Sequence, residues 1–151
     1  MTQFEPRNPE FETRVRDSFE KQAAMHRIGA TLERVTPGEV DILLPYDAEL
    51  TQQHGFMHAG MISTVLDSAC GYAAFTLMPV DAGVLAVEFK INLVAPAEGK
   101  SFLARGRVIR PGRTITACQG EAIARSATGE KTIAIMQSTI MAIHDRPGIE
   151  D

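Results

Sequence analysis

The spacing of apolar residues changes along the chain, and the first pattern has the period of a helix. Between Phe11 and Ala23 an apolar side chain recurs every four residues, and most of the positions between are charged or polar. This pattern predicts an amphipathic helix that ends near Met25. The segment Asn8-Pro9, followed by two glutamates, is typical of a helix start, because asparagine caps the first turn and proline fits its first position.

Beyond Ile28 apolar residues alternate with polar ones, which is the period of half-buried strands. The sequence TPGE at 36–39 predicts a turn between the first two strands. The longest unbroken alternation runs from Leu85 to Leu93, and its odd-numbered residues are expected to form the apolar face. The expected strands cover residues 29–36, 40–44, 85–93, 101–110, 114–125 and 131–143.

The segment from His54 to Pro79 differs from the rest because it is apolar on nearly every side and carries one charged residue, Asp67. A helix of this kind must be buried. Helices segregated from a run of strands indicate an α+β fold, and we expect an antiparallel sheet wrapped around this helix. We divide the chain into an N-terminal helix (residues 1–27), the main domain (28–144) and a flexible tail (145–151).

The composition is that of an ordinary globular protein and excludes several classes of function. Apolar residues make up 44% of the 151 residues, and the formal net charge is −4. The chain has no basic block that would suit nucleic acid. Its longest apolar run, 69–80, is too short to span a membrane, and the acidic N-terminus does not resemble a signal peptide. We therefore expect a cytoplasmic protein with no nucleic-acid or membrane partner.

The two cysteines, Cys70 and Cys118, lie in apolar surroundings and lack the spacing of a zinc site. We expect both to be buried, reduced thiols. We expect no metal ion.

Asp67 needs an explanation, because a carboxylate is rarely buried without a partner or a function. On a helical wheel it shares one face with Gly60, Ser63, Thr64 and Gly71, which are all small. A ligand or a second chain would have room to approach the carboxylate on that face. We expect Ser63 or Thr64 to donate a hydrogen bond to it.

The start of the same helix offers a second functional group. The amides of Ala59 and Gly60 belong to the first turn, where N–H groups have no intrahelical acceptor. Such amides can stabilise an oxyanion, and with a carboxylate they are the groups needed for acyl transfer to water. Ala59 and Asp67 are about 12 Å apart along one helix. Both would act on one bond only if two antiparallel helices of a homodimer contributed to the site.

Three segments, HGFMHAGMISTVLDSACG, VEFKINLVAPAEG and RVIRPGRT, occur in the order found in a known family. They resemble the hotdog-fold acyl-CoA thioesterases, specifically the PaaI-type group of phenylacetic acid degradation. The resemblance extends from Ile28 to Ile143. It implies a sheet wrapped around a central helix, a homodimer with one continuous sheet, and often a dimer of dimers.

The resemblance also implies roles for individual residues. Asp67 matches the family's catalytic carboxylate, which acts as general base or nucleophile. Ala59, after His58, matches the oxyanion-hole amide, and Gln52, with Gln53 beside it, matches the residue that holds the attacking water or the substrate. The substrate would be an acyl-CoA, and no separate cofactor is implied. Further expected substrate contacts are Ser63, Thr64 and Ser68 on the helix, with Arg110 and Arg113 for the CoA phosphates.

His58 is also a candidate at the site, and its expected main role is to fix the helix start through a hydrogen bond. Two positions depart from the family pattern, because Ala59 replaces the usual glycine and Ala86 stands where some members have Ser or Thr. These departures concern the acyl group that is accepted more than the reaction type.

Two other functions stay open. A non-catalytic acyl-CoA-binding module would keep the pocket, and Asp67 would then be dispensable. An acyl-thioester hydratase or dehydratase would share the fold, but those families pair a histidine with an acid at other positions.

Overall fold

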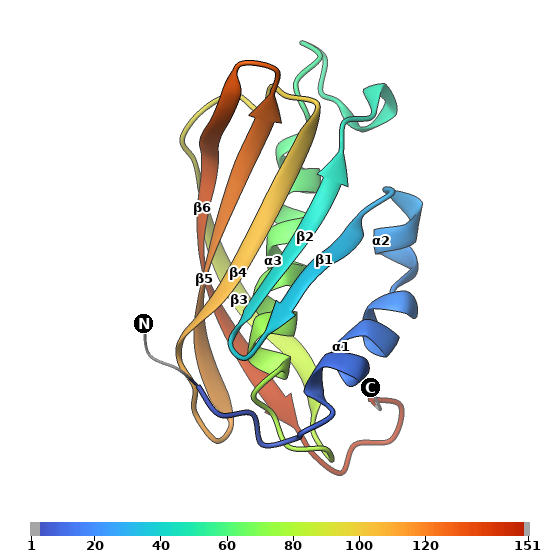
Figure 1. Cartoon of the computed structure of the whole chain (residues 1–151), viewed down its shortest axis with the longest axis vertical. Coiled ribbons are helices and arrows are strands. Elements are labelled where there is room, and N and C mark those ends of the chain that lie inside the picture. The colour runs from blue at the N-terminus through green and yellow to red at the C-terminus, as the bar shows by residue number, and fades with distance from the viewer. Residues whose placement is uncertain (1–3, 150–151) are drawn as a thin grey trace.

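The computed structural model describes residues 4–149, which form a single sheet and three α-helices (Figure 1). The predicted order of elements is confirmed, and most boundaries differ from the predicted ones by one to three residues. The elements are α1 (Phe11–Glu20), α2 (Ala23–Arg27), β1 (Thr31–Thr36), β2 (Glu39–Pro45), a 3-10 turn (Ala48–Leu50), α3 (Ala59–Phe75), β3 (Gly83–Leu93), β4 (Ser101–Arg110), β5 (Ile115–Ser126) and β6 (Gly129–Ile143).

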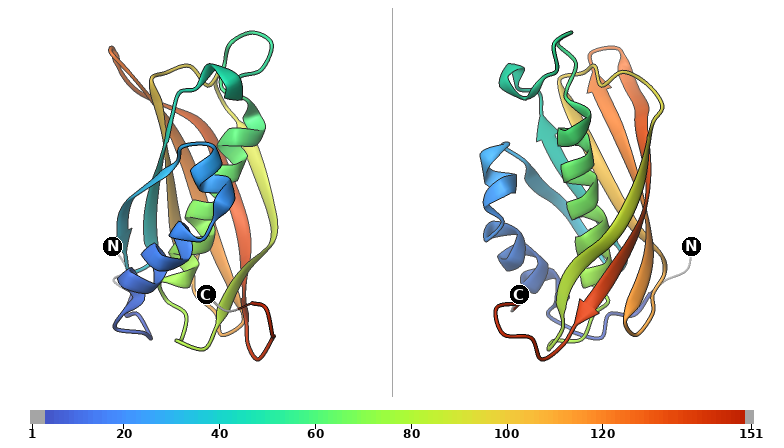
Figure 2. Two further views of the ribbon diagram at one scale, coloured as in Figure 1. Left: turned by 90° about the vertical axis from the view of Figure 1, so that its right-hand side faces the viewer. Right: turned by 180° about the vertical axis from the view of Figure 1, so that it is seen from behind.

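The sheet has six antiparallel strands in the order β1-β2-β4-β5-β6-β3. It curves around α3, and α1 and α2 lie on the other side of α3 (Figure 2, right). The predicted α+β hotdog architecture is therefore confirmed. Among residues 4–149, no helix is long and apolar enough to cross a bilayer.

Helix α3 packs against the sheet at very short range, because two glycines face it. A Cβ atom on Gly106 of β4 would lie 2.2 Å from the carbonyl oxygen of Ala69. On the neighbouring strand β5, a Cβ atom on Gly120 would lie 3.0 Å from the side chain of Leu66. Leu66 and Ala69 are fully buried as a result. The face of α3 that carries Asp67 is turned away from this contact.

The N-terminal helix is interrupted, although its apolar period predicts one continuous helix to Met25. At Gln22 the backbone leaves helical geometry, with φ −83° and ψ 88°, and α2 then begins at Ala23. The Gln22 side chain reaches α3, where its Oε1 atom accepts a hydrogen bond of 3.0 Å from Ser68. This contact lies between residues far apart in sequence, so the local period does not reveal it.

Helix α1 also fixes the connection between α3 and β3. The guanidinium of Arg14 donates hydrogen bonds to the carbonyl oxygens of Pro79, at 2.8 Å, and Ala82. It also lies 4.1 Å from the centre of the Phe75 ring. The start of β3 is thereby held in place by a residue of the N-terminal segment.

Strand β3 forms one edge of the sheet, and its regular alternation is broken by a bulge. The pairing with β6 shifts between Ala86 and Glu88, so Val87 is the inserted residue. Before the bulge the even-numbered Val84 and Ala86 pair with buried residues of β6, and after it the odd-numbered Phe89 does, so these residues lie on the same side of the sheet. The prediction that the odd-numbered residues form one continuous apolar face is therefore wrong.

Cys70 and Cys118 are both buried free thiols, as expected. Burial raises the pKa of each thiol, which keeps both in the neutral form.

Substitution of Gly106 tests the close contact between α3 and β4. We expect Gly106→Ala to lower the free energy of unfolding by about 3 kcal/mol, because the added methyl group meets backbone atoms that cannot rotate away. Gly71→Ala on α3 is the matched control, since a Cβ atom there meets nothing within 4 Å. The control should leave stability unchanged or raise it by up to about 1 kcal/mol through helix propensity. Equal effects in urea unfolding would contradict the packing described here.

Candidate active site

The first turn of α3 is fixed by its own capping residue. His58 precedes the helix with extended backbone geometry, and its Nδ1 atom accepts a 2.8 Å hydrogen bond from the amide of Gly60. This matches the expected structural role of His58, and it places the ring proton on Nε2. Gly60 gives the His58 ring room, because a Cβ atom at this position would lie only 3.0 Å from Nδ1.

The cap decides which amide is available to a ligand. The Gly60 amide was an expected oxyanion donor, but it already donates to His58. The Ala59 amide finds no acceptor among residues 4–149. A donor at the positive end of a 17-residue helix is well placed to bind a developing oxyanion. Ala59 is therefore the candidate donor, and the Gly60 assignment is corrected.

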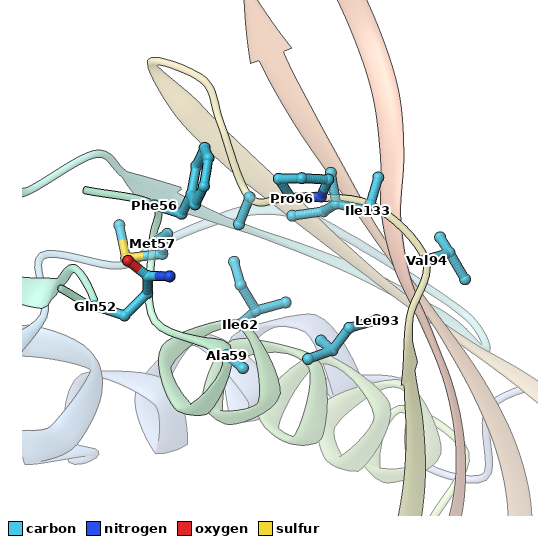
Figure 3. A pocket seen from close by; sticks show the side chains of 11 residues that line it. Gln52, Phe56, Met57, Ala59, Ile62, Leu93, Val94, Pro96 and Ile133 are labelled. Atoms are coloured by element: carbon cyan, nitrogen blue, oxygen red, sulfur yellow. The ribbon is translucent and has the colours of Figure 1, made fainter. Parts of the chain in front are cut away.

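A cavity of about 480 Å³ opens at this end of α3. Figure 3 shows Gln52 and Ala59 on one side of it, with Val94 and Pro96 on the opposite side. Its walls are mostly apolar and come from the loop before α3, from α3 itself and from the end of β3. The lining residues are Gln52, Phe56, Met57, Ala59, Ile62, Leu93, Val94, Ala95, Pro96, Ala97 and Ile133.

Gln52 lies at this cavity, as the resemblance implies. Its backbone N–H donates to Phe56 at 2.8 Å, and its Oε1 atom accepts a hydrogen bond from the backbone of His54. These bonds hold the loop in a tight turn. The side-chain Nε2 group of Gln52 has no acceptor among the residues described, so it is available to a ligand in the cavity.

A second, smaller cavity of about 140 Å³ lies two turns further along α3 and contains Asp67. The carboxylate is partly desolvated, and its Oδ1 atom is buried without a hydrogen-bond partner among residues 4–149. Burial raises the pKa of Asp67, because the charged form loses solvation that no neighbour replaces. Such an arrangement costs stability, and it is typical of a group retained for chemistry.

The hydroxyl groups near Asp67 do not support it in the expected way. Ser63 donates to the carbonyl oxygen of Ala59 at 2.8 Å, and Thr64 donates to that of Gly60 at 2.7 Å. Both hydroxyls therefore bond back to the preceding helical turn. The prediction that Ser63 or Thr64 binds the carboxylate is wrong, and Ser68 lines the Asp67 cavity while donating to Gln22.

Five predicted substrate contacts line neither cavity: Ser63 and Thr64, whose hydroxyls bond to the preceding turn, and three residues that lie further away. Gln53 is exposed on the loop before α3, beside His54. Arg110 and Arg113 are exposed at the connection between β4 and β5. That connection lies near the C-terminal end of α3, because Arg113 and Leu77 line the same surface pocket. The connection between β4 and β5 lies at the end of α3 opposite its first turn (Figure 1).

Several lining residues were missed by the sequence reasoning, for identifiable reasons. Val84 lines the Asp67 cavity because the bulge changes the phase of β3, and it does so beside Ala86, which the family pattern had already singled out. Ser18 and Gln22 reach it from the N-terminal helices. No local pattern reports these contacts, since each joins distant parts of the chain.

A sequence-family model described as "Thioesterase superfamily" matches residues 54–129, just over half of the chain. The chain belongs to the thioesterase superfamily. The matched region contains α3, Asp67 and the Ala59 amide, whereas α1, α2, β1, β2 and β6 lie outside it or at its end.

Known proteins resemble this thioesterase-superfamily chain to different degrees. A solved thioesterase family protein from Silicibacter pomeroyi is 51% identical, with a TM-score of 0.87, over 89% of this chain and 98% of that one. The PaaI protein from the phenylacetic acid degradation operon of E. coli is 17% identical, with a TM-score of 0.79, over 89% of this chain and 94% of that one. At that identity the likeness concerns the fold alone.

Curated relatives match over a shorter length. A protein of Saccharolobus solfataricus named "Putative esterase" is 30% identical over 101 residues, 67% of each chain. Another of that name from Halobacterium salinarum is 30% identical over 93 residues, 58% of this chain and 61% of that protein. The chain thus spans about three fifths to two thirds of the length of these relatives.

The raised pKa of Asp67 predicts how stability depends on pH. Below the ordinary pKa of 3.8 the Asp67 carboxyl group is neutral in the folded and unfolded states, so its ionisation does not lower the free energy of unfolding. As pH rises through the raised pKa, the folded state must hold a desolvated charge and loses stability. We therefore expect the melting temperature of Asp67→Asn to exceed that of the wild type at pH 7, and this difference to shrink towards pH 3.5.

Melting temperatures at a fixed protein concentration measure this difference. Asp17→Asn is the matched control, because the carboxylate of Asp17 is exposed on α1. A stability advantage of Asp67→Asn that grows as pH falls would contradict the assignment of a desolvated carboxylate.

Proposed function

We propose that the chain is a homodimeric acyl-CoA thioesterase of the PaaI type, with each active site formed by two protomers. The observation that carries this proposal is the unpartnered Oδ1 atom of Asp67 at a cavity. An ionised carboxylate without a protein partner is free to activate water or to attack a carbonyl carbon. The free Ala59 amide supplies the complementary donor for the oxyanion.

The geometry of one protomer does not bring these groups together. Asp67 and Ala59 are eight positions apart on one straight helix, which separates them by about 12 Å. They also lie in different cavities. A second copy of the helix, running in the opposite direction, would place one Ala59 amide close to the other Asp67.

Strand β3 supplies the surface for such a pairing. One side of β3 bonds to β6, and the other side has no strand beside it among residues 4–149. Apolar side chains are unusually open along this edge, with Val87 52%, Phe89 43% and Leu93 55% exposed. A long apolar edge of this kind favours pairing with another strand.

Antiparallel pairing of two β3 strands would join the two kinds of cavity. Val84 and Ala86, near the start of β3, line the Asp67 cavity. Leu93, at the end of β3, lines the Ala59 cavity. In an antiparallel pair the start of one strand lies beside the end of the other. Each Asp67 cavity would therefore adjoin the Ala59 cavity of the partner subunit.

In the proposed reaction the thioester carbonyl oxygen accepts a hydrogen bond from the Ala59 amide. Asp67 of the other protomer takes a proton from water as the water attacks the carbonyl carbon, or attacks that carbon itself. The tetrahedral oxyanion collapses, the carbon–sulfur bond breaks and CoA leaves as a thiolate. In the direct route, water then hydrolyses the mixed anhydride. In the base route the thiolate takes the proton held by Asp67, and in the direct route it takes the proton released when water hydrolyses the anhydride. The net reaction converts acyl-CoA and water to free acid and CoA.

Turnover of acyl thioesters tests the reaction. We expect the wild type to release free thiol from at least one member of a panel of short, medium, long and aryl acyl-CoAs. Asp67→Asn should lower kcat by about 100-fold or more, because the amide cannot act as base or nucleophile. Asp17→Asn on the exposed face of α1 is the control.

The same panel separates this proposal from its alternatives. Full turnover by Asp67→Asn would remove the assignment of Asp67. Binding of acyl-CoA without any hydrolysis by the wild type would instead favour a binding module. Hydration of an enoyl-CoA, measured as the loss of its ultraviolet absorbance, would favour a hydratase.

A complementation experiment tests the shared site. Ala59→Pro deletes the amide proton, and proline suits the first position of a helix preceded by an extended residue such as His58. We expect Ala59→Pro to lower kcat by about 100-fold or more through loss of the oxyanion donor. Ala59→Gly, which keeps the N–H group, is the comparison variant.

Mixing the two weakened proteins distinguishes a shared site from a site within one protomer. A heterodimer of Asp67→Asn and Ala59→Pro contains one site with both lesions and one site with neither. After unfolding and refolding of an equal mixture, activity should return to about a quarter of the wild-type value, since about half of the dimers are mixed. If each protomer held a complete site, no activity would return.

A further inference from the structure

Gln22 lies outside the region that matches the thioesterase superfamily, yet it reaches the Asp67 cavity. It occupies the break between α1 and α2. Its backbone is fixed there, because its N–H group donates to Phe19 at 3.0 Å and its carbonyl oxygen accepts from Met25 at 3.0 Å. The side chain therefore starts from a defined position beside α3.

The Gln22 side chain does not cap α2, although it stands at the capping position. Glutamine is not among the residues favoured there. Instead its Oε1 atom accepts the 3.0 Å hydrogen bond from Ser68, the neighbour of Asp67 in sequence. This bond leaves the Nε2 group as a donor with no acceptor among residues 4–149. The side chain is half-buried and lines the cavity, so this donor is available to a ligand that enters it.

The rest of the cavity is polar on the side of the N-terminal helices. The hydroxyl groups of Ser18 and Tyr72 lie 3.3 Å apart in its wall. Val84 and Ala86 form the apolar wall on β3. Gly71 contributes no side chain, and the space in front of it is open.

The volume limits what this cavity can hold. About 140 Å³ corresponds to four or five water molecules, at roughly 30 Å³ each. An acyl tail of a similar number of non-hydrogen atoms would fill it.

We propose that Gln22 is a specificity-determining residue that selects short acyl groups carrying a hydrogen-bond-accepting oxygen. The Nε2 group of Gln22, held in place by Ser68, donates to that oxygen while Asp67 faces the thioester. This inference rests on the proposed thioesterase function and adds the class of acyl group to it. An acyl group with a methyl group in place of the oxygen leaves the donor buried and unpaired, which disfavours its binding.

Two acyl-CoAs that differ by one group test this selectivity. We expect the wild type to have a kcat/KM for 3-hydroxybutyryl-CoA at least about fivefold higher than for 3-methylbutyryl-CoA, in which a methyl group replaces the hydroxyl. Gln22→Met keeps the length of the side chain but removes the donor, so this ratio should fall to about one. Gln137→Met, on an exposed position of β6, is the matched control and should keep the wild-type ratio.

Ser68→Ala is a second variant that leaves the Gln22 amide in place but removes its anchor. We expect the ratio to fall in this variant as well, by a smaller factor. Melting temperatures of all variants separate a change in selectivity from a loss of folded protein.

The outcomes distinguish this inference from the proposed function. A ratio that is unchanged in Gln22→Met, or an equal loss of kcat/KM for both substrates, would overturn the role of Gln22. If the wild type hydrolyses no thioester of the wider panel, the proposed function fails, and the same preference is then measured as a ratio of dissociation constants by calorimetry. Equal dissociation constants for the two acyl-CoAs would overturn the inference independently of turnover.

Discussion

The contact between α3 and β4 is the constraint on which the arrangement of the molecule depends. At Gly106 the strand carries no side chain, so the backbone of α3 at Ala69 approaches it directly. This approach fixes the rotation of the helix about its own axis. Leu66 and Ala69 must face the sheet, and Asp67 is consequently turned towards the open side. A bulkier residue at position 106 would push the helix away and loosen the position of the carboxylate.

The elements governed by local periodicity were predictable from the sequence, and those governed by distant contacts were not. The period of two located the strands, and the nearly uniform apolar character of residues 59–75 identified the buried helix. The break at Gln22 and the bulge at Val87 depend on partners on other elements. The roles of Asp67 and Ala59 as candidates followed from the sequence, but the availability of the Ala59 amide depends on the His58 cap.

Desolvation connects the chemistry of Asp67 with the open edge of the sheet. In one protomer the carboxylate is already partly buried, and this raises its pKa. Pairing of a second copy along β3 would exclude more water from the same region. A low local dielectric strengthens the interaction of an oxyanion with the Ala59 amide, while it increases the cost of the unpaired charge. In the proposed site the desolvated carboxylate of Asp67 lowers the stability of each protomer, and the same desolvation strengthens the interaction between the oxyanion and the Ala59 amide in the dimer.

In the proposed enzyme the N-terminal helices set selectivity, while the groups assigned to the chemistry lie on α3. Asp67 and Ala59 belong to α3, which the sheet holds rigidly. Ser18 belongs to α1 and Gln22 to the break between α1 and α2, and both approach the Asp67 cavity from outside the matched region. Arg14 anchors α1 to the start of β3, so the two walls of the cavity are tied to each other. A substitution at Gln22 would therefore change the lining of a cavity whose shape is kept by separate contacts.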